Sequence, residues 1–537
     1  MSASDHHSSI QDALESSLRL HPKRIQLGQA EMLTDALLHP FDDLDRRLTT
    51  YISGSNEGNV LRKQMQAYLS RLNANPLIPL HFRLKVLKRF EEQLDLFDAE
   101  MTAAVLNAHK IGIDMVQKEA LTERSYYQIL VNMVSDAIEL AGRLMRDDLS
   151  AYHAPAVITV RQVFDLMRLG MLIIPELPEE AEREKKRLFL AIVRYELLRN
   201  LDFFSLTKSE QRMVMDELAH HIGMLRPYYL AKNELKSSEI KGYSLMATSF
   251  SRPHDTAKVL PFPPDNSASD FLLVPMDDFI DKLVLSIDRA EKVLKNPVLQ
   301  NKDIQIEAAL HTTVVGGNAI LDALRNRSRS TERQEYGNAK LVAGWSFNQS
   351  IEDIVRLMST QENALNQVVD TSDAELSRTP GQWTVKNISK SGIALERMSI
   401  EEPKQGVGAL IGLHWKVFRG EPLLGFIRWI RYPKAGEQQM GLSFYLRPYV
   451  PTHATMLTVG STDKRRGWPV LFTFEEDGEH TVVFPDTNIF KGLVFSVEDK
   501  RCPGYFKVLK VAESGINYSV CTVRLATELD TSNLNAN

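Results

Sequence analysis

Apolar side chains in the first half of the chain recur every three or four residues, which is the spacing of an α-helix that buries one face. Residues 82–97 show this spacing clearly, with an apolar stripe made of Phe82, Val86, Leu87, Phe90, Leu94 and Phe97. Thr207 and Glu210 form a capping-box pair, which predicts that a helix begins there. We therefore predict a helical array over residues 26–250, after a disordered polar arm at residues 1–25.

The chain between residues 251 and 276 is rich in proline and small polar residues, so a linker is predicted there. Helical spacing returns over residues 277–324, where two connecting helices are predicted. The first carries an apolar stripe formed by Phe279, Ile280, Leu283, Val284, Ile287, Ala290 and Leu294. The second is weakened at Gly316 and Gly317, because glycine lowers helix propensity.

Beyond about residue 336 the pattern changes to short runs of β-branched and aromatic residues, separated by Gly, Pro, Lys and Glu. Six of these runs predict a small antiparallel β-barrel of six strands over residues 325–450. In chain order the runs are AKLVAGW, QWTV, GIAL, VGALIGLHW, LLGFIRWIRY and MGLSFYL. A helical pattern at about residues 348–370 is predicted to be an insertion after the first strand.

Five further β runs predict a second, barrel-like β module over residues 451–527: PVLFTF, HTVVF, GLVFSV, YFKVLKV and SVCTVRL. Asp477 and Gly478 lie between the first two of these runs, and this pair is a strong signal for a β-hairpin. A polar tail is expected at residues 528–537. The predicted fold class is therefore α+β and multidomain, with a helical N-terminal array followed by two β modules.

The length of 537 residues favours several domains, and an apolar fraction of 43% with a charged fraction of 25% is average for a soluble protein. The net charge of −5 makes nucleic acid an unfavourable partner, because wrapping it needs many cations on one face. Cys502 and Cys521 are the only cysteines, which fits a reducing compartment. No apolar run approaches the roughly 20 residues that span a bilayer, and the first residues lack a signal-peptide pattern. A cytoplasmic protein without membrane insertion is therefore expected.

Motifs that would indicate an enzyme are missing from the sequence. It contains no Gly-x-Ser-x-Gly elbow, no Gly-x-x-x-x-Gly-Lys-Ser/Thr loop and no His-Glu-x-x-His pair. His220 and His221 are neighbours on a predicted helix, where side chains point about 100° apart, so they are poorly placed to share a metal ion. We therefore expect neither catalysis nor a bound metal or other cofactor.

Four short motifs follow one another in the region of the first predicted barrel. They are Arg329-Ser-Thr-Glu-Arg333, Asn387-Ile-Ser389-Lys-Ser-Gly392, Gly425-Phe-Ile-Arg428-Trp429 and Gly441-Leu-Ser-Phe444. In this order they resemble the PilZ domain, the bacterial receptor for cyclic di-GMP. The resemblance covers about residues 325–447 and implies a six-stranded barrel that binds this second messenger.

By this resemblance, Arg329 and Arg333 grip guanine and phosphate from an arm that precedes the first strand. A guanidinium group suits both targets, because it can meet guanine O6 and N7 with two parallel hydrogen bonds and can also pair with a phosphate. Arg325 has the same spacing to Arg329 and is expected to be a secondary contact.

The motif of Asn387, Ser389 and Gly392 is expected to form the opposite wall of the site. Asn387 and Ser389 carry short polar side chains, while Gly392 permits a positive φ angle and a close approach. We predict that the segment is a longer turn than a two-residue hairpin, because its polar side chains and exposed amides then form a cradle for an anion.

The predicted function is thus a cyclic di-GMP receptor that signals to an unknown protein partner through its helical domain. The main alternative hypothesis is a scaffold whose helical array is the working surface and whose barrel does not bind nucleotide. A third hypothesis, RNA binding, would rely on Trp415, Trp429 and Tyr432, and the acidic balance of the chain disfavours it. The sequence leaves homo-oligomerisation open.

Overall fold

The computed structural model of the chain describes residues 58–75, 77–92, 97–232, 244–253, 255, 257–260, 269–295, 304–325, 334–335, 340–343, 382–389, 391–398, 406–414, 423–434, 436–445, 449–457, 468–475, 478–485, 488–497 and 504–526. The arm predicted at 1–25, the insertion predicted at 348–370 and the tail predicted at 528–537 lie outside the described residues. The chain divides into two compact units. The first comprises Met1–Ala151, Pro155–Asp202 and Glu210–Ser328, and the second comprises Tyr152–Ala154, Phe203–Ser209 and Arg329–Asn537.

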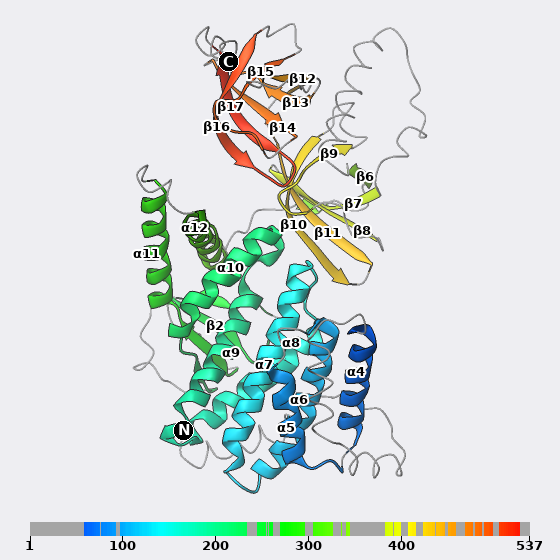
Figure 1. Ribbon diagram of the computed structural model, residues 1–537, viewed down its shortest axis with the longest axis vertical. Coiled ribbons are helices and arrows are strands. Elements are labelled where there is room, and N and C mark those ends of the chain that lie inside the picture. The colour runs from blue at the N-terminus through cyan, green and yellow to red at the C-terminus, as the bar shows by residue number, and fades with distance from the viewer. Residues whose placement is uncertain are drawn as a thin grey trace. The chain divides into compact units, whose positions relative to one another are not determined.

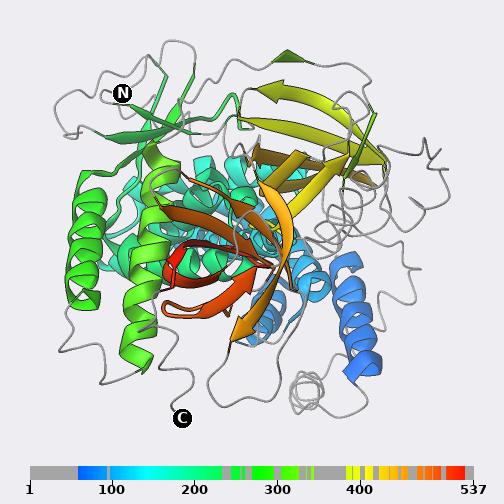
Figure 2. The same ribbon diagram turned by 90° about the horizontal axis from the view of Figure 1, so that it is seen from above.

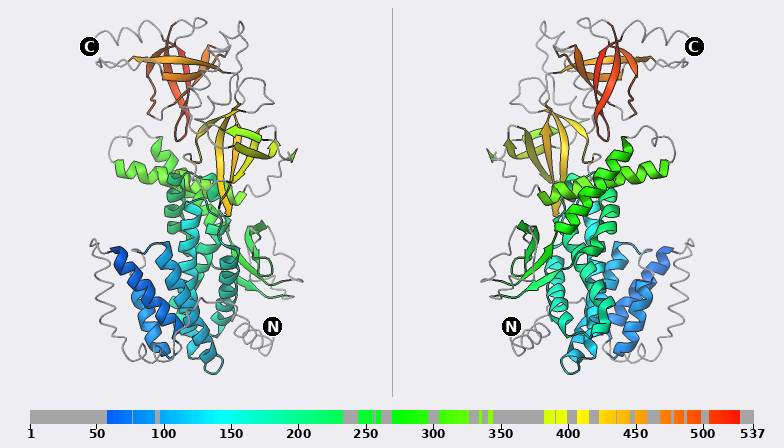
Figure 3. Two further views of the ribbon diagram at one scale, coloured as in Figure 1. Left: turned by 90° about the vertical axis from the view of Figure 1, so that its right-hand side faces the viewer. Right: turned by 90° about the vertical axis from the view of Figure 1, so that its left-hand side faces the viewer.

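The first unit is mainly helical, as the sequence predicts (Figure 1). Its helices are α4 (Gly58–Ala74), α5 (Leu80–Glu91), α6 (Ala99–Ala120), α7 (Tyr126–Ser150), α8 (Val157–Ile173), α9 (Glu182–Asn200), α10 (Lys208–His221), α11 (Asp277–Leu294) and α12 (Ile304–Arg325). Helix α7 packs against α6, α8 and α9, and Figure 3 shows these helices side by side. Helices α11 and α12 pack against each other (Figure 2), and Thr313 of α12 donates to Glu217 of α10 at 3.2 Å. No helix in the described part of the chain is both long and apolar enough to cross a membrane.

Apolar stripes explain why these helices form and pack. In α5 the predicted positions Val86, Leu87 and Phe90 are buried. In α11 four members of the predicted stripe are buried: Phe279, Leu283, Ile287 and Ala290. Each buried Val, Leu, Ile or Phe side chain contributes roughly 1.5–3 kcal/mol by leaving water. Helix α10 begins one residue after Thr207, which confirms the helix start that the capping pair predicts.

A four-stranded antiparallel sheet completes the first unit, and sequence patterns did not predict it. Its strands are β1 (Tyr228–Leu230), β2 (Leu245–Ser249), β3 (Lys258–Leu260) and β4 (Phe271–Pro275), in the order β1-β4-β2-β3. The segment at residues 251–276 is therefore not the linker that its composition predicts, because it supplies β3 and β4. The apolar residues of β4 decide the outcome, since Leu272, Leu273 and Val274 are all buried.

The second unit begins with a seven-stranded antiparallel sheet. Its strands are β5 (Gln334–Glu335), β6 (Lys340–Ala343), β7 (Gln382–Ser389), β8 (Gly392–Met398), β9 (Leu410–His414), β10 (Leu423–Lys434) and β11 (Glu437–Phe444), in the order β5-β7-β6-β9-β10-β11-β8. Strand β8 pairs with β7 as well as with β11, so the pairings of β6 to β11 run in a ring. The six β runs predicted between residues 336 and 450 fall on these six strands, one on each.

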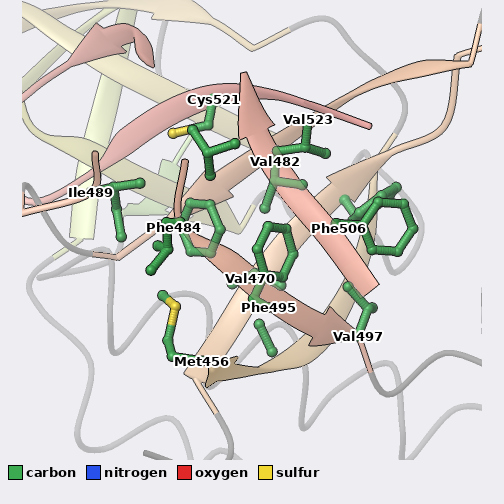
Figure 4. Close-up of a cluster of buried hydrophobic side chains, with 14 residues drawn as sticks. Met456, Val470, Val482, Phe484, Ile489, Phe495, Val497, Phe506, Cys521 and Val523 are labelled. Atoms are coloured by element: carbon green, nitrogen blue, oxygen red, sulfur yellow. The ribbon is translucent and has the colours of Figure 1, made fainter. Parts of the chain in front are cut away.

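A closed antiparallel barrel of six strands follows in the same unit. Its strands are β12 (Val450–Leu457), β13 (Trp468–Thr473), β14 (Glu479–Phe484), β15 (Val494–Val497), β16 (Tyr505–Ser514) and β17 (Ser519–Leu525), in the order β12-β13-β14-β17-β16-β15. Its core is aromatic and aliphatic, and the Phe495 ring lies 5.1 Å from that of Phe484 and 5.9 Å from that of Phe506 (Figure 4). Gly478 has a φ of +80° just before β14, as a hairpin glycine would. The α+β class, with a helical N-terminal region before a closed barrel and other sheets, is confirmed.

Within the second unit, the sheet and the closed barrel share one apolar cluster. Its buried members are Leu410, Leu424, Phe426, Tyr445, Leu471, Val483 and Tyr518. The side chain of Asn517 adds two hydrogen bonds, because its Oδ1 accepts from the backbone N–H of Leu410 at 3.0 Å and its Nδ2 donates to the Leu410 carbonyl at 3.2 Å. These contacts fix β16 and β17 against β9 and β10.

Candidate ligand-binding site

The hairpin between β7 and β8 is tighter than predicted. Ser389 pairs with Gly392 at the ends of the two strands, so only residues 390 and 391 connect them. The prediction of a longer turn is therefore wrong, and Asn387 and Ser389 belong to strand β7 itself. The connection can be short because both strands continue their backbone pairing up to the last residue.

A β-bulge in β7 determines where the polar side chains of this strand lie. The register shifts between Val385 and Asn387. Before the shift, Trp383 and Val385 belong to the buried core of the sheet, and after it Ile388 packs against that core. Because neighbouring side chains of a strand point to opposite faces, Asn387 and Ser389 are turned away from the core.

Gly392 is required for close packing between strands rather than for a turn. It is not among the described residues with a positive φ angle, so that part of the prediction is wrong. A Cβ atom at this position would overlap the carbonyl oxygen of Leu442 on β11. The glycine therefore allows the backbones of β8 and β11 to approach each other at the end of the hairpin, while the expected approach of a ligand to Gly392 stays a prediction.

Three of the four motifs meet around one hollow on the outer face of the sheet. The hollow has a volume of about 180 Å³, and residues of β7, β8, β10 and β11 line it. The lining includes Asn387, Ser389, Gly392, Arg428, Trp429 and Gly441. Carboxylate, imidazole and thiol groups do not contribute to the lining, so the hollow is unsuited to a metal ion. Its amide, hydroxyl, guanidinium and indole groups are suited to a polar ligand with an aromatic part.

Arg428 supplies the positive charge at this hollow. It is the extra residue of a second bulge, because Ile427 pairs with Leu442 while Trp429 pairs with Gly441. Its Nε donates to Ser443 Oγ at 2.7 Å, and its Nη1 lies 3.7 Å from Glu513 Oε1. The Arg428 side chain keeps 52% of its surface exposed, so its guanidinium group is oriented while one part still faces solvent.

Glu513 is itself held by Tyr518, whose hydroxyl donates to Glu513 Oε1 at 2.7 Å. Burial raises the pKa of Tyr518, and the hydrogen bond to Glu513 raises it further. The phenol thus remains protonated at any physiological pH and keeps donating to the carboxylate. Arg428 is therefore positioned by Ser443 on its own sheet and by the Glu513–Tyr518 pair on the closed barrel.

The indole of Trp429 lies directly over Gly441 on the neighbouring strand. A Cβ atom at Gly441 would overlap Nε1 and Cε2 of the indole, so only glycine permits this arrangement. An aromatic ring that covers a cross-strand glycine is a known means of stabilising strand pairing. At this hollow it also provides a flat apolar wall.

The structure describes only part of the predicted arginine arm. Arg329 and Arg333 lie outside the described residues, and Arg325 is the last residue of α12. Strand β5 begins at Gln334, immediately after Arg333, and pairs with β7 so that Gln334 faces Ile388 and Glu335 faces Asn387. The peptide that follows Arg333 is thus attached to the edge of the strand that carries Asn387 and Ser389.

Sequence reasoning missed the roles of Arg428, Trp429 and Ser443 at the hollow. Arg428 and Trp429 marked a strand motif, Trp429 was otherwise considered only for RNA binding, and Ser443 was not singled out. A signal was nonetheless present, because the apolar alternation breaks at Val385-Lys-Asn-Ile388 and at Ile427-Arg-Trp-Ile430, where the bulges lie. Comparison of the chain with known protein families and with curated proteins found no match.

Proposed function

We propose that the second unit is a PilZ-like receptor for cyclic di-GMP, and that the hollow lined by Asn387, Ser389, Arg428 and Trp429 holds part of this ligand. Arg329 and Arg333 close on the remainder from the segment before β5, with Arg325 as a secondary contact. The protein acts without catalysis and passes the binding event to a protein partner through its helical unit.

One observation carries the proposal: strand β5 pairs with the end of β7 beside the hollow. Gln334 faces Ile388 in this pairing, and Arg333 is bonded directly to Gln334. A peptide unit spans only about 3.8 Å between Cα atoms, and an arginine side chain is long enough to reach several ångströms further. The basic segment and the polar face of β7 are therefore within reach of one ligand.

The chemistry of the lining matches the parts of a cyclic dinucleotide. Guanine presents O6 and N7 to a guanidinium fork, and each bidentate contact of this kind is worth about 1–3 kcal/mol. The Trp429 indole offers a face on which a base can stack. Arg428 adds a charged donor for a phosphate oxygen, while Asn387 and Ser389 offer short polar groups at the opposite edge.

Strand β10 gives such a receptor a route for its signal. Arg428 and Trp429 lie on this strand at the hollow, and Tyr432 follows three residues later. The backbone N–H of Tyr432 donates to the carbonyl of Tyr152 at 2.9 Å, and its ring stacks on His153 with centroids 4.9 Å apart. Residues 152–154 lie in the connection between α7 and α8. Under the proposal, ligand binding favours one arrangement of β10, and this segment passes the change to the helices.

Calorimetric titration of the full chain with cyclic di-GMP tests the proposal. The wild-type chain is expected to bind cyclic di-GMP with a defined stoichiometry. Arg333→Ala and Arg428→Ala are each expected to weaken binding by about 5- to 150-fold, which corresponds to about 1–3 kcal/mol. Arg226→Ala is the matched control, because it removes an exposed arginine of the first unit and should leave binding unchanged.

Two results would contradict the receptor hypothesis. The first is the absence of any heat of binding to the folded wild-type chain, and the second is equal affinity of wild type, Arg333→Ala and Arg428→Ala. Either result would favour the alternative hypothesis, in which the sheet has lost nucleotide binding and the helical unit acts as a scaffold.

A further inference from the structure

Three side chains with metal-ligating atoms come together inside the helical unit, and none of them belongs to the four motifs of the second unit. Glu91 is the last residue of α5, His109 lies within α6 and Asp136 lies within α7. Each offers one ligand atom, and these atoms all lie within 4.8 Å of one another. Facing helices of a bundle commonly supply metal sites in this way, with one or more ligands from each helix.

The cluster is buried but it borders a cavity. His109 is 0% exposed and Asp136 is 7% exposed, while the Glu91 side chain keeps 21% of its surface accessible. All three line a cavity of about 420 Å³, whose wall also holds three basic residues, a further carboxylate, an amide and several apolar side chains: Lys88, Arg183, Arg187, Glu184, Asn132, Leu84, Leu87, Ile129 and Met133. Burying ionisable groups is costly unless they are paired or coordinate a metal. The cavity leaves room for an ion and for water on its open side.

The imidazole of His109 has the orientation of a metal ligand. Its Nδ1 lies 3.0 Å from the carbonyl oxygen of Val105, one helical turn earlier, and donates its proton there. Its Nε2 is thereby directed at Glu91 Oε1, at 2.7 Å. Histidines that bind metals typically donate their second ring N–H to a backbone carbonyl or a carboxylate, which fixes the ring and leaves the other nitrogen for the ion.

Asp136 has a comparable outer partner. The Nη2 of Arg187, on α9, forms an ion pair with Asp136 Oδ1. This contact holds the carboxylate from the side of α9, and carboxylates that bind metals are commonly held by such outer contacts. The positive charge of Arg187 also opposes a cation, so two anionic carboxylates are needed to make binding favourable.

We propose that Glu91, His109 and Asp136 bind one divalent transition-metal ion, with water in its remaining coordination positions. One imidazole nitrogen and two carboxylate oxygens suit Zn²⁺ or a neighbouring transition ion better than Ca²⁺, which takes six to eight oxygen ligands. On binding, bonds form from the ion to Nε2 and to one oxygen of each carboxylate, and any proton carried by these atoms leaves to solvent.

The geometry requires only a small adjustment of side chains. Zn–N and Zn–O bonds of about 2.1 Å in a tetrahedron separate the ligand atoms by about 3.4 Å. The Glu91–His109 contact, now 2.7 Å, must therefore open by about 0.7 Å, and any separation in the cluster that exceeds 3.4 Å must close. Glu91 is the side chain best able to move, because it is the most exposed of the three.

Zinc binding to the chelator-stripped full chain tests the site. The titration is made in competition with a chelator of moderate affinity, so that exposed histidines remain unloaded. We expect one Zn²⁺ per chain in the wild type, and a loss of affinity of at least about 100-fold in Asp136→Asn and His109→Gln. His221→Gln is the matched control, because His221 pairs with Glu217 at 2.9 Å on α10 outside the cluster and should bind zinc normally.

A second measurement keeps the test informative if the variants unfold. The wild-type chain loaded with Co²⁺ should show the visible absorption of a low-symmetry nitrogen–oxygen site without thiolate charge transfer, and Zn²⁺ should abolish that spectrum. The proposal is overturned if the wild type takes up no ion in the presence of the competing chelator. Equal zinc affinity of wild type, folded Asp136→Asn and folded His109→Gln would overturn it as well.

Discussion

The contact between Trp429 and Gly441 can be tested by a double-mutant cycle. In Gly441→Ala the new methyl group would overlap the indole, so either the indole must rotate away or β10 and β11 must separate locally. In the double variant, Trp429→Ala has removed the indole, so the methyl group of Ala at position 441 enters the space that the indole leaves. The effects of the two substitutions on the free energy of unfolding should therefore not add, although each single substitution removes favourable packing.

The magnitude follows from the kind of overlap. Forcing an extra methyl group into a packed position typically costs about 1–3 kcal/mol, and we expect about 2 kcal/mol for Gly441→Ala in the wild-type background. In the Trp429→Ala background the cost should fall to about zero or become slightly favourable, since glycine within a strand is itself destabilising. The coupling free energy should thus be about 2 kcal/mol.

Urea unfolding of the four chains, followed by near-ultraviolet circular dichroism, measures this coupling. With a slope of about 3 kcal/mol per molar urea, 2 kcal/mol moves the transition of the second unit by about 0.7 M. If Gly441→Ala lowers stability equally in both backgrounds, the indole does not lie over Gly441 and the wall of the hollow is misassigned. Under the proposed function, Gly441→Ala should also weaken cyclic di-GMP binding, because it displaces the stacking surface.

Three further outcomes are expected. Arg428→Lys should weaken cyclic di-GMP binding by about tenfold although it keeps the charge, because lysine cannot both donate to Ser443 and present a planar fork; calorimetry showing wild-type affinity would argue against a direct contact. Burial raises the pKa of the Cys521 thiol to about 12, so this thiol should react slowly in the folded state. In a chain whose other cysteine is replaced by serine, a disulfide reagent at pH 8 should react with Cys521 far more slowly in the folded than in the urea-unfolded state. Equal rates would show that the thiol is accessible. Asn517→Ala should destabilise the second unit by about 1–3 kcal/mol in urea melts, since it removes two hydrogen bonds to Leu410, and an unchanged midpoint would contradict that contact.

Strand patterns in the second unit were predictable because each strand buries one face. The runs that became β6 to β11 and β13 to β17 alternate apolar and polar residues or carry continuous β-branched and aromatic residues. Strand β12 was missed because VPTHATML contains a proline and few large apolar residues. The sheet of the first unit was missed for a different reason, since two of its strands have only three residues each.

Contacts between distant residues account for what sequence patterns could not predict. Glu91, His109 and Asp136 are separated by 18 and 27 positions, so no short motif links them, and only the packing of α5, α6 and α7 brings them together. The hollow likewise depends on the register of β10 against β11. Registers of this kind are fixed by the burial of whole strand faces, which a local pattern does not show.

The two bulges explain how polar residues can line a site on strands whose opposite face is buried in the apolar core. In β7, strict alternation from Trp383 and Val385 would turn Asn387 and Ser389 toward the core; the bulge sends Ile388 there instead. In β10, Ile427 and Ile430 both belong to the core, and the bulge places Arg428 and Trp429 outside it. The polar residues therefore gather on one outer surface without exposing the apolar residues beside them. This is why a tight two-residue connection suffices: the polar face comes from the strands, and the turn need only join them.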